Sequence, residues 1–159
     1  MTGKTSDDRR RKGPWAAGAL ALLSVVAVAV WWVGRAADEE RLDTRLAAWS
    51  DAPLPAPGDP VDGALADVGA DIFRSRCSAC HQVRGEPKLG PNLAGVTARR
   101  SYRWIEHMIL RPDSMTLDDP VAAALRAQYG VQMMVPGGMT PVRARAVLEF
   151  LRRADEEEG

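Results

Sequence analysis

The apolar residues of this chain are concentrated near its N-terminus. Residues 15–33 read WAAGALALLSVVAVAVWWV and contain no charged side chain. A helix rises about 1.5 Å per residue, so this run spans roughly 28 Å, close to the thickness of the hydrocarbon core of a bilayer. The pattern therefore predicts a single transmembrane helix at residues 15–33, preceded by a short N-terminal segment at 1–14.

The charges on the two sides of this run differ in sign. RRRK at residues 9–12 precedes it, and DEE at residues 38–40 follows it. Because positive residues favour the cytoplasmic side, we expect residues 1–14 in the cytoplasm and the rest of the chain outside. Trp15, Trp31 and Trp32 stand at the ends of the run, where tryptophan rings favour the lipid headgroups.

A cleaved secretory signal is the alternative interpretation of the N-terminus. Such signals have an apolar core of about 7–15 residues followed by a small-residue cleavage site. Here the apolar run is longer, and the only candidate site, near residues 36–37, is poor. Both interpretations export the remainder of the chain, whereas a buried helix of a soluble protein does not explain the flanking basic cluster and tryptophans.

The pattern after the apolar run predicts a linker, a compact domain and a tail. Within the linker, residues 34–61, an amphipathic helix could cover 36–50, with Leu42, Leu46 and Trp49 along one side. The next stretch, DAPLPAPGDP, has four prolines and favours an extended, semi-rigid spacer. Residues 62–155 are expected to fold as one domain, followed by an acidic tail at 156–159.

Helical periodicity dominates the domain, and strand signals are nearly absent. The expected helices are 63–76, about 99–110, one that opens at Asp119-Pro120 and stops at Gly130, and a last one that begins after Thr140. The segment 111–120 is expected to be a loop insertion. The fold class is therefore all-α, with four to five short helices. So few short helices bury a small core, and we expect a bound group to fill the middle.

The two cysteines of the chain lie in the sequence CSACH, at residues 77–81. C-x-x-C-H is the attachment signature of c-type haem. Two thiols about one helical turn apart can add to the two vinyl groups of one porphyrin, and the adjacent histidine can then reach the iron. The motif therefore predicts that Cys77 and Cys80 hold a covalent haem c.

Three other interpretations of the motif are weaker. A thioredoxin-like redox pair requires a βαβ context, which the pattern lacks. A structural zinc site requires four ligands, and only Cys77, Cys80, His81 and the distant His107 are available. A disulfide alone leaves the adjacent histidine unexplained.

Residues 63–154 resemble a class I c-type cytochrome of the small, membrane-anchored, bacterial monohaem kind. Four features match in order: a helix with Gly69 and Phe73 that leads into CSACH, the loop LGPNLAG at 89–95, the segment YGVQMM at 129–134, and a final helix with Val147 and Phe150. The resemblance implies a cytochrome c fold in which the first and last helices cross near Gly69.

The resemblance also implies the ligands of the haem. Cys77 and Cys80 would form thioethers, and His81 would be the proximal axial ligand. Pro91 resembles the proline whose carbonyl accepts a hydrogen bond from that histidine, a contact that orients the ring and raises its basicity. Met133 is the expected distal ligand, with Met134 as the alternative, because the loop departs from the commoner methionine-proline pattern.

Several other residues have two interpretations. Trp104, Tyr102 and Phe73 could line the haem pocket, although core packing is the simpler interpretation for Phe73. The basic run of Arg99, Arg100 and Arg103 could pair with haem propionates but is simply explained as a solvated helix side. His107 is expected on a polar face, and Met108, Met115 and Met139 are expected as core or loop fillers.

Composition excludes some functions and favours one. Lys and Arg together number 21, as do Asp and Glu, so the basic excess of a nucleic-acid binder is absent. The sequence presents no catalytic constellation, so we expect an electron carrier of the bacterial inner membrane with a periplasmic haem domain, not an enzyme. Expected partners are a quinol-oxidising complex, a terminal oxidase or reductase, and the bilayer itself. The alternatives are a fixed subunit of such a complex and a haem sensor with a labile methionine.

Overall fold

The computed structural model describes residues 14–130 and 137–157, with side chains from residue 20 onward. The chain divides into two compact units, Met1–Arg41 and Leu42–Gly159. All regular secondary structure in the described ranges is helical. The all-α prediction is therefore confirmed.

The first unit is formed by most of helix α1, which begins at Pro14 and ends at Leu46. By length and composition the described helical stretch is able to cross a bilayer, a test that a signal sequence also passes. Its large apolar side chains from Leu20 to Val33 are exposed. Near the end of this apolar stretch, the guanidinium of Arg35 lies 5.5 Å from the centroid of the Trp31 ring, a cation–π contact.

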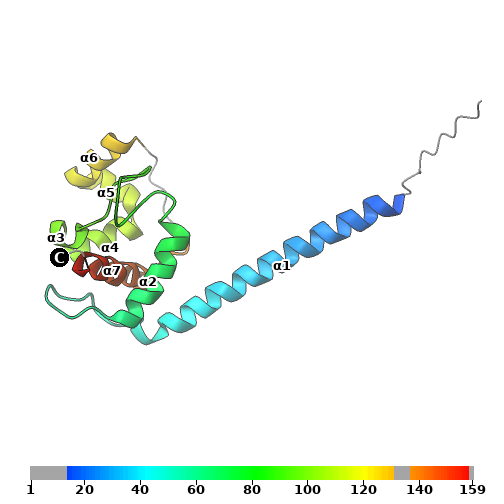
Figure 1. The fold of residues 1–159 in the computed structure, drawn as a ribbon, viewed down its shortest axis with the longest axis horizontal. Helices are drawn as coiled ribbons and strands as arrows, with labels where there is room; N and C mark the ends of the chain where they lie inside the picture. Colours follow the sequence, from blue (N-terminus) through cyan, green and yellow to red (C-terminus); the bar gives the residue numbers. More distant parts are fainter. Residues whose placement is uncertain (1–13, 131–136, 158–159) are drawn as a thin grey trace, which may run out of the picture. The chain divides into compact units, whose positions relative to one another are not determined.

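The core of the second unit is built on two helices, α2 (Gly63–Arg76) and α7 (Pro141–Glu156), which lie side by side (Figure 1). Both have the predicted limits because side chains cap their first turns. Asp62 accepts a hydrogen bond from the backbone N–H of Leu65, and Thr140 accepts one from that of Arg143. The apolar faces of the two helices supply most of the buried side chains of the domain.

The two helices make their closest approach at Gly69. A Cβ atom at this position would lie 1.8 Å from the carbonyl oxygen of Ala146 and 3.0 Å from the Cβ of Phe150. One turn further on, the rings of Phe73 and Phe150 pack with centroids 5.0 Å apart. Glycine is therefore required at position 69, and the crossing expected from the family resemblance is present.

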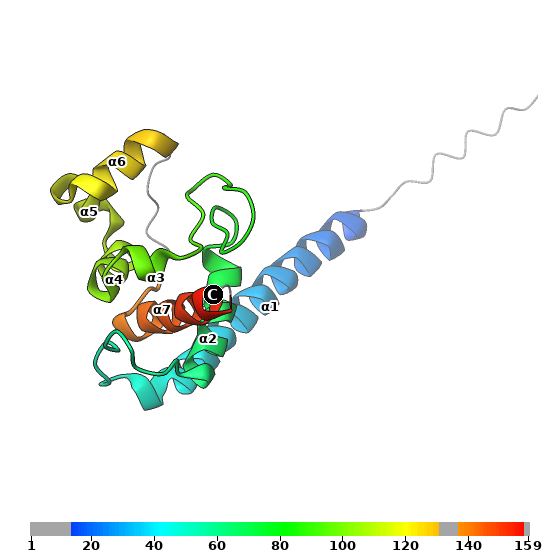
Figure 2. The same cartoon turned by 60° about the vertical axis from the view of Figure 1, so that its left-hand side comes forward.

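Helices α3 to α6 cover the remainder of the domain: α3 (Val96–Arg99), α4 (Tyr102–Leu110), α5 (Pro112–Asp118) and α6 (Pro120–Tyr129). Helix α4 packs against α7 on one side and against α5 on the other, while α5 packs against α6. In both views α5 and α6 lie together, apart from the α2–α7 pair (Figure 2). Helix α6 has the predicted limits, with Asp119 as its cap and Gly130 in the left-handed conformation at its end.

Two details of this region differ from the sequence-based expectation. The helix expected from about residue 99 is divided at Arg100, whose extended backbone ends α3, and Ser101 caps the new start of α4. The expected loop at 111–120 is largely helical because Pro112 occupies the first position of α5. The described part of the domain thus has six helices where four or five were expected.

Residues 42–61, here called the strap, also belong to the second unit. Leu46 is 1% exposed and lies within the core cluster, and Leu42, Trp49 and Leu54 pack against that cluster. The expected amphipathic helix is present as the last residues of α1 and a 3-10 turn at Ala47–Trp49. The segment expected to be a spacer therefore contributes apolar side chains to the core.

We predict that Gly69→Ala lowers the free energy of unfolding by about 3 kcal/mol, because the new methyl group overlaps the backbone of α7. The matched control is Gly63→Ala, on the same helix, where an added Cβ meets no atom within 4 Å. The control should change stability by less than about 1 kcal/mol, in the stabilising direction. Denaturant unfolding of the two variants checks this, and equal effects would contradict the close approach.

Candidate functional site

The CSACH segment continues directly from α2. The backbone N–H of Cys77 donates to the carbonyl of Phe73, and the N–H groups of Cys80 and His81 both donate to the carbonyl of Cys77. The segment therefore forms one tight turn that holds the two cysteines and the histidine near the end of the helix. All three side chains are half-buried.

Both cysteines are free thiols in this structure. Burial raises the pKa of the Cys77 thiol to about 11, and the neighbouring Arg76 only partly opposes this effect. The thiol is therefore neutral near pH 7. A disulfide between the two cysteines is not what organises this turn, since the turn is closed by backbone hydrogen bonds.

The imidazole of His81 is fixed from one side by the loop that follows. Its Nδ1 lies 2.9 Å from the carbonyl oxygen of Pro91, the contact that the family resemblance implies. Because a carbonyl can only accept, Nδ1 carries the proton and Nε2 keeps its lone pair available for a metal. A Cβ at Gly90 would lie 2.6 Å from the Cε1 of this ring, so Gly90 permits the ring to lie against the backbone.

The loop from residue 82 to residue 95 is itself held at several points. The N–H of Gly90 donates to the carbonyl of Cys80, and that of Leu93 donates to the carbonyl of Gln82. Lys88 Nζ donates to the carbonyl of Ser78 over 2.8 Å. In Figure 2 this green loop follows α2 on the side of the domain where α5 and α6 lie. The contacts fix the loop, and with it the carbonyl that orients His81.

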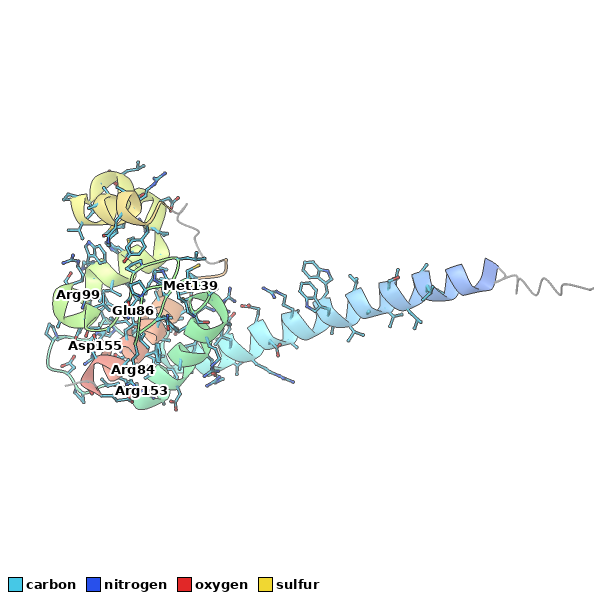
Figure 3. The ribbon with its side chains drawn as sticks, turned by 45° about the horizontal axis from the view of Figure 1, so that its top comes forward. Arg84, Glu86, Arg99, Met139, Arg153 and Asp155 are labelled. Carbon is cyan, nitrogen blue, oxygen red and sulfur yellow. The ribbon has the colours of Figure 1, made fainter. Side chains whose placement is uncertain are left out.

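Asp155, near the end of α7 (Figure 3), anchors the end of this loop. Its carboxylate accepts hydrogen bonds from the N–H of Gly95, 2.6 Å away, and from the N–H and hydroxyl of Thr97. Asp155 thus caps α3 from a helix about 60 positions away in the sequence. Sequence reasoning missed this residue, because a distant cap leaves no local spacing to recognise.

Partly buried side chains gather near the CSACH turn and the helices that face it. Those packed against the core cluster include Cys77, Val83, Leu93, Tyr102, Trp104, Ile109 and Met139. Phe73 is buried against Phe150, which supports the core interpretation of that residue.

The aromatic rings of α4 are in contact with arginines. The Arg152 guanidinium lies over Tyr102, and that of Arg100 lies over Trp104. Arg99 donates to the carbonyl of Ala94, within its own loop. These contacts tie Arg99 and Arg100 to the adjacent helices, and Arg103 is exposed, as expected for a solvated side of the helix.

Other candidate ligands are located differently. His107 is exposed on α4, as expected for a polar-face residue. Met133 and Met134 lie outside the described residues. Within residues 14–130 and 137–157, no three His, Cys, Asp or Glu side chains approach closely enough to hold a metal ion, so this part of the chain offers no zinc site.

The residues present fit a covalently attached haem. Two free thiols three positions apart offer the two attachment points, and one imidazole offers a single nitrogen whose partner nitrogen is already engaged. The glycine against the ring and the adjacent half-buried apolar side chains suit a flat, apolar group. A metal held by protein side chains alone would instead need several converging ligands.

Comparison with known proteins agrees with this assignment. A model of the cytochrome c family matches residues 66–155. A cytochrome c-553-like protein of Synechocystis sp. is 40% identical over 45 residues, which cover 28% of this chain and 43% of that protein. The chain thus spans less than half of that relative. Cytochrome c2 of Rhodopila globiformis is 28% identical over 106 residues, covering 60% of this chain and 92% of the relative.

A solved structure is similar over most of the second unit. Cytochrome c from Rhodothermus marinus is 34% identical, with a TM-score of 0.61, and the alignment covers 70% of this chain and 95% of that one. The similarity extends to fold and sequence together. The chain therefore belongs to the cytochrome c family and carries covalently attached haem c.

Proposed function

We propose that this protein is a membrane-anchored monohaem cytochrome that carries single electrons between respiratory partners on the periplasmic side of the bacterial inner membrane. The observation that carries the proposal is the fixed imidazole of His81, held by the Pro91 carbonyl and packed on Gly90 directly beside two free thiols. That arrangement suits an iron ligand that must keep one orientation through repeated changes of oxidation state.

Each residue of the site has one role in the proposal. Cys77 and Cys80 hold the haem through thioethers, His81 binds the iron through Nε2, and the Pro91 carbonyl keeps the proton on Nδ1. Met133 supplies the second axial ligand, with Met134 as the alternative. When bound, haem c supplies reversible one-electron exchange between Fe(III) and Fe(II).

The ligand pair favours electron transfer over catalysis. A thioether is a soft ligand that stabilises Fe(II), so a histidine–methionine pair raises the reduction potential above that of two histidines. With both axial positions taken by side chains, no position remains for a substrate. The chain's own contribution is to hold the two ligands so that little rearrangement accompanies the change in charge.

The N-terminal helix supplies the location and the class of partners. An exposed apolar stretch preceded by RRRK is consistent with an anchor whose N-terminus is cytoplasmic. Confinement to the membrane raises the concentration of the carrier near membrane-bound proteins. We propose a quinol-oxidising complex as the donor and a terminal oxidase or reductase as the acceptor.

Purification from membranes of a host that matures c-type cytochromes tests this function. We expect resistance to alkaline carbonate extraction, a haem that stays attached after denaturation, and a reversible one-electron titration. The control, Cys77→Ala with Cys80→Ala, should lose the covalent haem but remain in the membrane fraction. A chain without bound tetrapyrrole, or one released by carbonate, would contradict the proposal.

We expect Gly90→Ala to disturb the iron ligand, because the new methyl group would lie 2.6 Å from the ring of His81. The ring must move away from Pro91, and a less basic imidazole stabilises Fe(III) less, so the reduction potential should rise. The overlap should also cost about 1–3 kcal/mol of stability. The control is Gly137→Ala, where an added Cβ meets no atom within 4 Å. A potential equal to that of the wild type would count against the fixed imidazole.

Substitution of the two methionines in turn identifies the distal ligand. Met133→Ala should abolish the weak long-wavelength absorption that methionine sulfur gives to oxidised haem, and the reduced protein should bind carbon monoxide rapidly. Met134→Ala should retain the absorption and bind carbon monoxide slowly. The opposite pattern assigns Met134, and retention of the absorption in both variants would show that neither is the ligand.

A further inference from the structure

The strap, residues 42–61, is attached to the haem domain along its whole length. Near its start, Leu46 is buried in the core cluster, and Leu42 and Trp49 pack against that cluster. Leu54 makes a further apolar contact in the proline-containing part. Burial of a leucine side chain stabilises a fold by about 1.5–3 kcal/mol, so this segment is not a free spacer.

Ionic contacts hold the beginning of the strap. The carboxylate of Asp43 accepts hydrogen bonds from Nη2 and Nε of Arg143 on α7, over 2.6 and 3.2 Å. The side chain of Arg143 is 4% exposed, so this paired contact is shielded from solvent on the side of the cation. Arg45 also contacts Asp71 on α2, although both side chains are half exposed, so this pair adds little.

The indole of Trp49 joins the strap to the first turn of α2. Its Nε1 donates to Oδ2 of Asp62 over 2.7 Å, while Oδ1 of the same carboxylate caps the helix. The N–H of Leu65 lowers the pKa of Asp62, burial opposes this, and Trp49 lowers it further. The carboxylate is therefore ionised at neutral pH, which strengthens the hydrogen bond from the indole.

A buried ion pair on α7 holds the far end of the strap. Arg152 contacts Glu149 over 2.8 Å, and their side chains are 4% and 2% exposed. Arg152 also donates to the carbonyl of Asp59, and Glu149 accepts from the N–H of Asp62. Loss of one partner of a buried pair is strongly destabilising, so both charges require the strap to remain in place.

We propose that the strap works as part of the haem domain and that the tether to the membrane helix is only residues 34–41. Fully extended, these 8 residues span at most about 29 Å, whereas residues 34–61 would span about 100 Å. The partner that fits this reach is a membrane-embedded redox protein whose docking face lies close to the bilayer surface. This inference rests on the proposed function, because it requires the anchor.

The short tether has a measurable consequence. For a flexible tether the effective concentration at the membrane falls roughly as the −3/2 power of its length. Lengthening from 8 to 28 residues therefore lowers encounter with a surface-bound partner roughly sixfold. Two changes produce the same 28 residues: insertion of 20 Gly/Ser residues after Ala37, and release of the strap by Leu46→Ala with Trp49→Ala.

The test uses the full holoprotein in lipid vesicles that carry ferrocene on the lipid headgroups. One electron passes from the reduced haem to ferrocenium, giving oxidised haem and ferrocene, with no proton transferred. Both the insertion and the strap-release variant should be oxidised roughly sixfold more slowly than the wild type. Oxidation by soluble ferricyanide should be equal in all three, and Ala48→Ser, at an exposed strap position, should match the wild type.

Hydrogen exchange supplies a second readout that does not depend on the haem. The amides of residues 42–62 should be protected in the wild type and in the insertion variant, and should exchange rapidly in the strap-release variant. The insertion leaves the strap sequence intact, so its result stands even if the double variant unfolds.

The outcomes separate this inference from the proposed function. If the strap is free in the wild type, the insertion slows oxidation only about twofold, the double variant has no effect, and the short-tether inference is wrong while the anchored carrier stands. If carbonate releases the wild-type chain from the vesicles, the anchor itself is absent and both proposals fail.

Discussion

The contact between Gly69 on α2 and the carbonyl of Ala146 on α7 determines the position of nearly everything else in the haem domain. Because the two backbones touch, the end of α2 has one direction, and the CSACH turn that follows it has one location. The same helix α7 caps α3 through Asp155 and holds the strap through Arg143, Glu149 and Arg152. A single helix thus fixes the haem-binding turn, the loop of Pro91 and the segment that leads to the membrane.

The parts of the fold that the sequence predicted are those with local signals. The limits of α2, α6 and α7 follow from Asp62, Asp119 and Thr140, each a capping residue directly before its helix. The attachment motif and the contact of His81 with Pro91 were also available in advance, because the chemistry of haem attachment requires fixed spacing. Such features are encoded within a few residues and do not depend on the rest of the chain.

The parts that the sequence did not predict depend on distant partners. The proline-containing strap has the composition of a spacer, and only the positions of α2 and α7 show that Leu46 and Trp49 are core residues. Asp155 lies in an acidic-looking end of α7, and its hydrogen bonds to residues 95 and 97 exist only once the fold is formed. Helix α5 begins at Pro112, a residue that also fits a loop. Composition is a poor guide wherever tertiary contacts outweigh local preference.

The long sequence separation between α2 and α7 has a consequence for the order of folding. A chain that has emerged only as far as α6 has no partner for the apolar face of α2, since that partner is the last helix to be synthesised. Pairing of elements so far apart in sequence is slow compared with formation of a single helix. During that interval the thiols of Cys77 and Cys80 are accessible to solvent, and the final helix encloses them only afterwards. The architecture therefore provides a period in which covalent attachment can precede burial.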